Sequence, residues 1–160
     1  MTTYLKDIDY ETNKSEMTIC LTNKQFDGEI RKCYVDISFK FGRQCSERVP
    51  GLIAEFHQEI NQTIMWTEYD IDALYDQINN MLSCDMNKES YYWLTLVAEQ
   101  EFEALCFLSE YENETYVTLF VSVGINSMGP AIKLTTSKST LIQWVTELKQ
   151  EFYRGTKKDV

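Results

Sequence analysis

Two stretches with the hydrophobic spacing of an α-helix, 70 residues apart, constrain the fold of this chain most strongly. Each places apolar side chains at i, i+3, i+4, i+7 and i+11, which predicts an amphipathic helix packed on a core. We expect helices at about 68–82 and 138–153. Their match reflects either a duplication or, as we favour, the common pattern of two capped helices on a sheet. The matching stripes are Ile71, Leu74, Tyr75, Ile78 and Leu82 in the first helix, and Leu141, Trp144, Val145, Leu148 and Phe152 in the second.

Residues that favour helix starts precede both stretches. Thr67 and Asp70 have the spacing of an N-capping motif, with Asp in place of the usual Glu or Gln. Ser137 can cap the second helix in the same way. Glu68, Asp70 and Asp72 also suit the positive end of the helix dipole, so these three carboxylates have a local structural role.

The remaining regular segments predict β-strands. Residues 31–41 alternate apolar and polar side chains, which indicates a strand with one buried face. Residues 52–65 fit either a strand or a helical turn. The order of strands, helix, strands, helix predicts an α+β domain with a mostly antiparallel β-sheet on which the two helices pack. Further strands are expected at 17–22, 91–98, 102–108, 115–123 and 131–136.

The length of 160 residues predicts a single globular domain, 1–160. The polar segments 1–16 and 154–160 are candidates for mobile termini. No apolar run approaches the length of a membrane span, and the opening residues lack the pattern of a secretory signal. The five cysteines include no CxxC pair, so we expect reduced thiols in a cytoplasmic protein.

The net charge of the chain is concentrated in one third of it. Residues 67–114 hold twelve carboxylates and a single base, Lys88, for a net charge of −11, whereas the whole chain has −10. Such asymmetry favours a basic protein partner, because charge acts at long range on encounter and partner choice. It disfavours nucleic acid, which needs clustered Lys and Arg side chains.

We predict a partner-binding surface from the carboxylates that lack a local structural role and from nearby aromatic residues, which often anchor interfaces. The oligomeric state is expected to be a monomer or a weak homodimer. The predicted surface residues are Asp76, Glu99, Glu101, Glu103, Glu110, Glu112, Glu114, Trp66, Tyr91 and Tyr92.

No constellation of catalytic residues stands out, and we predict no catalytic residue, metal ligand or cofactor. His57 is the single histidine, and the cysteines are dispersed, which disfavours zinc. The alternating triplets 99–103 and 110–114 could instead hold a divalent cation. A metal-dependent hydrolase and a homodimeric regulatory or structural subunit therefore remain as alternatives to a binding protein.

Residues 67–152 resemble small bacterial immunity proteins of the polymorphic-toxin kind, including those that guard against contact-dependent growth inhibition and wall-associated toxins. The resemblance implies a cytoplasmic, non-enzymatic protein that binds one cognate toxin domain. Such toxins are often basic nucleases, so the carboxylates would stand in for phosphates. The segments that carry the resemblance are Thr67-x-x-Asp-Ile-x-x-Leu, the stretch 99–103, the Glu112-Asn113 turn, the β run 117–123 and Ile132-x-Leu-Thr-Thr-Ser-x-Ser-x-Leu-Ile-x-Trp-Val.

Overall fold

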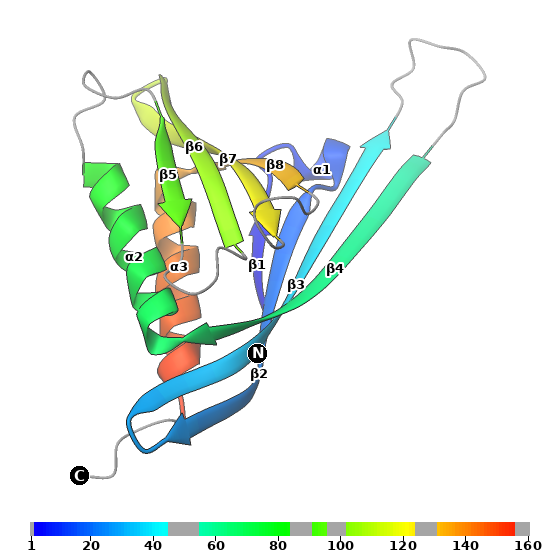
Figure 1. The fold of residues 1–160 in the computed structure, drawn as a ribbon. Helices are drawn as coiled ribbons and strands as arrows, with labels where there is room; N and C mark the ends of the chain where they lie inside the picture. Colours follow the sequence, from blue (N-terminus) through cyan, green and yellow to red (C-terminus); the bar gives the residue numbers. More distant parts are fainter. Residues whose placement is uncertain (1, 45–54, 84–90, 96–101, 124–130, 156–160) are drawn as a thin grey trace.

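The computed structural model describes residues 2–44, 55–83, 91–95, 102–123 and 131–155, which form two four-stranded antiparallel sheets and three helices (Figure 1). The predicted α+β class is confirmed, and the strands divide into two sheets. The first sheet has the order β1 (Thr2–Lys6), β2 (Glu16–Asp27), β3 (Ile30–Gln44), β4 (Glu55–Thr67), with α1 (Tyr10–Asn13) between β1 and β2. The second has the order β5 (Tyr92–Thr95), β6 (Phe102–Tyr111), β7 (Glu114–Val123), β8 (Ala131–Ser137).

The two sheets repeat one plan, because each runs directly into a helix. Thr67 ends β4 and α2 (Glu68–Ser83) follows, whereas Ser137 ends β8 and α3 (Lys138–Tyr153) follows. The strand end, the cap residue and the helix of 16 residues in the second half therefore each lie 70 residues after their equivalents in the first half. Two ordinary helices on a sheet would not need the same four-strand order before them. The match seen in the sequence belongs to a structural repeat.

The predicted caps are confirmed at both helix starts. The backbone N–H of Thr67 donates to Oδ2 of Asp70 at 2.8 Å, and the Thr67 hydroxyl lies 3.0 Å from the same oxygen. Oγ of Ser137 accepts from the backbone N–H of Thr140 at 3.2 Å. Each cap satisfies polar groups that a helix start leaves unpaired.

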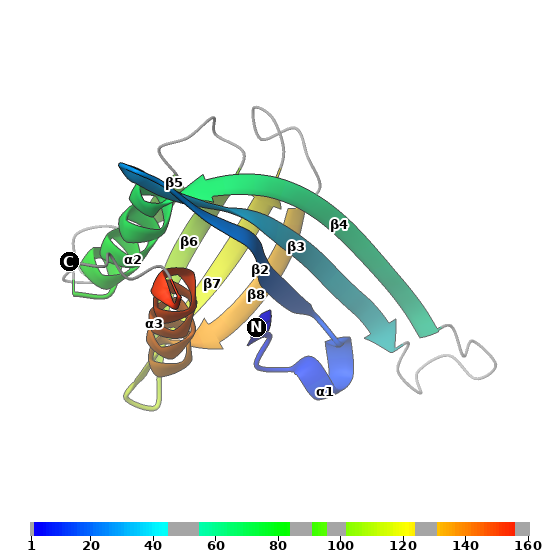
Figure 2. The same ribbon diagram turned by 90° about the horizontal axis from the view of Figure 1, so that it is seen from below.

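Strand alternation directs one face of each sheet inward, where the helices cover it. In β3 the buried side chains are Cys33, Val35, Ile37 and Phe39, which is the alternation expected from the sequence. Helices α2 and α3 lie side by side, and β2, β3 and β4 form a strongly curved sheet (Figure 2). Buried residues of both sheets and both helices make one continuous core.

Side chains and the N-terminal segment close the free edges of the second sheet. At β8, Ile8 N–H donates to the carbonyl of Thr135 at 2.8 Å, and the Thr135 N–H donates to Oδ2 of Asp7 at 2.7 Å. At β5, the Gln77 amide bonds both backbone groups of Thr95, at 2.7 and 3.0 Å. Covered edges resist pairing with other chains.

The expectation of a mobile segment at 1–16 is not met. Residues 2–6 form β1 along β2, and Leu5 is fully buried. Asp7 is held further by Asp9 N–H and by the Asn13 amide, at 2.8 and 2.9 Å. Of the expected mobile C-terminus, residues 156–160 lie outside the described residues.

Candidate binding surface

The outer face of the second sheet, turned away from the helices, carries a row of apolar side chains. Backbone register places Trp93 opposite Leu105, Leu105 opposite Phe120, and Phe120 opposite Lys133, so one row crosses all four strands. In the next row Phe107 stands opposite Thr118. We call Trp93, Leu105, Phe107 and Phe120 the aromatic face.

These three rings are open to solvent, although Phe107 and Phe120 lie on the central strands β6 and β7. Trp93 is 56% exposed, Phe107 38% and Phe120 40%. The Phe107 and Phe120 rings meet edge to face at 5.8 Å, and Nζ of Lys133 lies 6.0 Å from the Phe120 centroid. Single exposed apolar residues are ordinary, but a contiguous exposed cluster marks an interaction surface.

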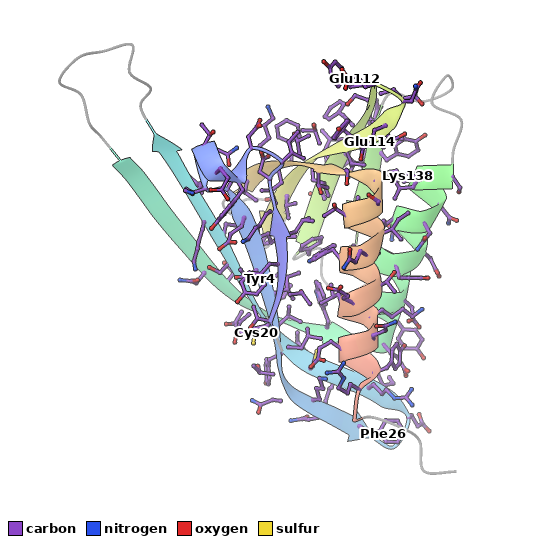
Figure 3. The ribbon with its side chains drawn as sticks, turned by 180° about the vertical axis from the view of Figure 1, so that it is seen from behind. Tyr4, Cys20, Phe26, Glu112, Glu114 and Lys138 are labelled. Carbon is purple, nitrogen blue, oxygen red and sulfur yellow. The ribbon has the colours of Figure 1, made fainter. Side chains whose placement is uncertain are left out.

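Carboxylates stand at both ends of this face. Glu103 pairs with Ser122 one row beyond Leu105, and Glu114 lies at the far end, opposite Tyr111. Figure 3 shows Glu112 and Glu114 at the hairpin tip between β6 and β7. Glu112 and Asn113 have φ of 50° and 62°, the positive values of a two-residue type I′ turn. The tip is therefore a tight turn that presents its acidic side chains to solvent.

A hydrogen bond links the acidic tip to the sheet. The Tyr116 hydroxyl donates to Oε2 of Glu114 at 3.1 Å. That bond, with the nearby negative charge, raises the pKa of Tyr116. The phenol consequently stays protonated and keeps donating at neutral pH.

Of the predicted surface residues, Tyr91, Glu103, Glu112 and Glu114 lie on or beside this face, whereas Glu110 has the opposite strand phase in β6. Tyr91, 53% exposed, directly precedes β5, and Glu110 is exposed near the hairpin tip. Asp76 is exposed on the solvent side of α2 and belongs to a different surface. Glu99 and Glu101 lie outside the described residues.

The two other predicted anchors lie toward the core. Trp66 is 1% exposed and packs against Phe102, so it cannot meet a partner while the core stays closed. Tyr92 is half-buried against the core, since it lies on the opposite side of β5 from Trp93, and it does not belong to the aromatic face.

Trp93, Leu105, Phe107 and Phe120 are not among the predicted surface residues, because they lie in segments that are rich in apolar residues. The alternation of buried and exposed positions along each strand would have indicated which of these side chains face solvent. In β7 the buried positions are Val117, Leu119 and Val121, so Phe120 falls in the solvent phase with Thr118 and Ser122. In β6, Phe107 shares its phase with Glu103 and Ser109.

The described parts of the chain do not bring metal-ligating side chains together, and two of their thiols are deeply buried. These parts contain no group of three or more His, Cys, Asp or Glu side chains that could hold a metal ion. Burial raises the pKa of both the Cys33 and Cys106 thiols to about 12, so neither is a nucleophile at neutral pH. Among the described helices, none has the length and apolar character of a membrane span.

Comparison with known proteins yields one distant neighbour. No protein-family model matches the sequence, and no curated protein matches it. The chain is similar to a solved structure of the plant transcriptional regulator PBF-2, with a TM-score of 0.34 and 9% identity over 96% of this chain and 79% of that one. A TM-score this low assigns neither a family nor a function.

Proposed function

We propose that this chain is a non-enzymatic immunity protein that binds a basic bacterial toxin domain through the aromatic face and its flanking carboxylates. The observation that carries the proposal is the apolar row in which Trp93 and Phe120 are exposed and Leu105 is partly exposed, with Glu103 and Glu114 on the same face of the sheet. The sequence resemblance to polymorphic-toxin immunity proteins supports the same assignment.

The two parts of the surface have different tasks in binding. The rings supply large, rigid apolar area, and side chains of this kind commonly dominate interface energies. The carboxylates attract a basic domain over distance and set its orientation. If the toxin is a nuclease, the carboxylates of Glu112 and Glu114 would bind the basic residues of the toxin that otherwise contact nucleic-acid phosphates.

Charge argues against nucleic acid and a second copy as occupants. Exposed rings on a sheet can stack bases, but such platforms lie in positively charged grooves. The described part of this face carries one basic residue, Lys133, and two acidic residues, Glu103 and Glu114. A homodimer through this face would bring two acidic surfaces together.

The partially buried free thiol of Cys20 fits a reducing compartment, so the proposed action is cytoplasmic.

A matched pair of charge reversals tests the electrostatic part of the proposal. The binding variant is Glu112→Lys/Glu114→Lys. The control is Glu29→Lys/Glu147→Lys, which changes two exposed glutamates elsewhere and gives the same net charge. The titrant for calorimetry is the purified C-terminal domain of the toxin that the proposal expects to be encoded immediately upstream of this chain, and titrations are run at low and at high salt.

We expect the binding variant to lose affinity at low salt by roughly tenfold or more, mainly through a slower association rate. The control should keep most of its affinity, because its charges lie away from the face. Equal losses in both variants would mean that total charge matters and this surface does not. No binding of the wild-type chain at low salt would exclude the proposal.

A further inference from the structure

The two sheets carry different side chains at equivalent positions of the structural repeat. The row of the first sheet that corresponds to the aromatic row of the second sheet is polar. Counted from the helix caps, Lys133 and Thr63 are equivalent, since each precedes its cap residue by four positions. Register then aligns Phe120 with Asp36, Leu105 with Cys20, and Trp93 with Thr2. One row of the scaffold is thus bulky and apolar in one half, but short and polar in the other.

The short side chains leave a hollow of about 510 Å³ on the outer face of β1–β4. Its floor comes from two adjacent rows. Thr18 stands between Tyr4 and Ser38, and Cys20 stands between Thr2 and Asp36. Tyr4 and Lys40 are taller side chains at its border. Figure 3 shows Tyr4 and Cys20 near each other on the first sheet, well away from Glu112 and Glu114.

One hydroxyl in this hollow is unused by the protein. Thr18 as a residue is 9% exposed and lines the hollow, and its side chain has no hydrogen-bond partner among the described residues. Its hydroxyl is not among the fully buried polar atoms, so it is open to the hollow. The Thr18 hydroxyl is therefore positioned to bond a ligand that enters the hollow.

The polar groups around Thr18 indicate the class of ligand. Asp36 is exposed and accepts from the Thr63 hydroxyl at 2.7 Å through Oδ1, and its carboxylate can accept further hydrogen bonds. Lys40, whose Nζ lies 4.0 Å from Glu16, adds a donor, so the lining of the hollow holds one acidic and one basic side chain. Hydroxyls and amides make up most of the rest, from Ser38, Asn61 and Thr63. Such a site suits a neutral ligand with many hydroxyl groups.

Tyr4 adds an apolar wall. It is 57% exposed at the edge of the hollow, so its ring can pack against the C–H face of a sugar ring. The volume lies within the range of small-molecule sites, roughly 300–1,000 Å³. We propose that the hollow on the first sheet binds a neutral mono- or disaccharide, with Thr18 and Asp36 bonding its hydroxyls and Tyr4 stacking on its ring. This proposal is independent of the toxin-binding surface.

Two readouts on the full chain test the saccharide site. Backbone NMR spectra are recorded with glucose, galactose, N-acetylglucosamine, maltose and cellobiose at high millimolar concentration. Sorbitol serves as a polyol without a ring face. Peptide-resolved alkylation follows Cys20, which is half-buried in the hollow, whereas Cys33 and Cys106 are buried with raised pKa values. A bound sugar should shift resonances of Thr18, Cys20 and Ser38, and should slow alkylation of Cys20.

The matched variants are Thr18→Val and Thr22→Val, both isosteric changes on the outer face of β2, the second outside the hollow. We expect Thr18→Val to weaken sugar binding by roughly 3- to 10-fold, the worth of one neutral hydrogen bond. Thr22→Val and Phe120→Ala should bind as the wild type does. No shift with any of the sugars, equal effects of sorbitol, or equal binding by Thr18→Val and Thr22→Val would each overturn the proposal.

Discussion

The indole ring of Trp66 and the phenyl ring of Phe102 meet edge to face, with 5.8 Å between their centroids and 86° between their planes. Trp66 lies near the end of β4 and Phe102 begins β6, so the contact joins the two halves of the repeat. Both residues are buried, at 1% and 2% exposure. The halves therefore share one core and should unfold together.

Replacing Trp66 with Ala should lower the free energy of unfolding by about 3–5 kcal/mol, the usual cost of removing a buried aromatic side chain. Trp93→Ala is the control, because Trp93 is 56% exposed, and it should change stability by no more than about 0.5 kcal/mol. Urea unfolding followed by circular dichroism measures both. Two separable transitions in the wild type, or similar losses in the two variants, would contradict a shared core.

Asp70→Ala should cost about 1–2 kcal/mol, because it removes the acceptor for two groups of Thr67 at the start of α2. Asp76→Ala changes an exposed carboxylate in the same helix and should leave stability nearly unchanged. Thermal unfolding compares the pair. Equal melting temperatures would show that the cap contributes nothing.

The ion pair between Lys24 and Glu151 should make the free energy of unfolding depend on pH in the acidic range. Nζ of Lys24 lies 3.2 Å from Oε1 of Glu151, and joins the first hairpin to the last turn of α3. Burial by itself would raise the pKa of Glu151, but the surrounding positive charge, with the hydrogen bond and charge of Lys24 foremost, outweighs it and lowers that pKa.

A carboxyl whose pKa is lower in the folded state stabilises the fold above its unfolded pKa, about 4.3 for Glu. That stabilisation is lost as the pH falls through the folded pKa. We expect Glu151→Gln to be less stable than the wild type at neutral pH, and the difference to shrink on acidification below about pH 4. Urea unfolding at several pH values measures it. A difference that stays constant with pH would contradict this role for Glu151.

Thr18→Val should leave the free energy of unfolding unchanged or raise it. The substitution keeps the shape of the side chain and removes a hydroxyl that has no hydrogen-bond partner among the described residues. Thermal unfolding without added sugar is the measurement. A loss of more than about 1 kcal/mol would mean that the hydroxyl stabilises the fold itself.

Local patterns predicted most of the fold. The predicted helices at 68–82 and 138–153 agree with the structure to within one residue, because hydrophobic periodicity and capping residues are local features of the sequence. The alternation of apolar and polar side chains over 31–41 predicts the central part of β3. The sequence did not reveal β1 or the division into two sheets. Those features depend on pairing between distant segments, such as Ile8 with Thr135, which leaves no mark on local composition.

The proposed binding surface contains several of the predicted carboxylates but few of the predicted aromatic residues. Glu103, Glu112 and Glu114 adjoin the aromatic face because they occupy solvent-facing or turn positions of β6 and β7. Burial of Trp66 depends on the phase of β4, and the preceding residues 52–65 do not fix that phase because they fit either a strand or a helical turn. The exposure of Phe120 is hidden in the sequence because its neighbours Leu119 and Val121 make the whole segment apolar.

Calorimetry with one exposed ring removed shows whether the aromatic face binds the toxin domain. Phe120→Ala is titrated with the same purified toxin domain as above, and Tyr34→Ala serves as the control, since Tyr34 is a similarly exposed ring (45% against 40%) on the first sheet. We expect Phe120→Ala to lose about 2 kcal/mol of binding energy, roughly 30-fold in affinity, while Tyr34→Ala binds as the wild type does. Unchanged binding by Phe120→Ala would contradict the aromatic face as the site of partner recognition.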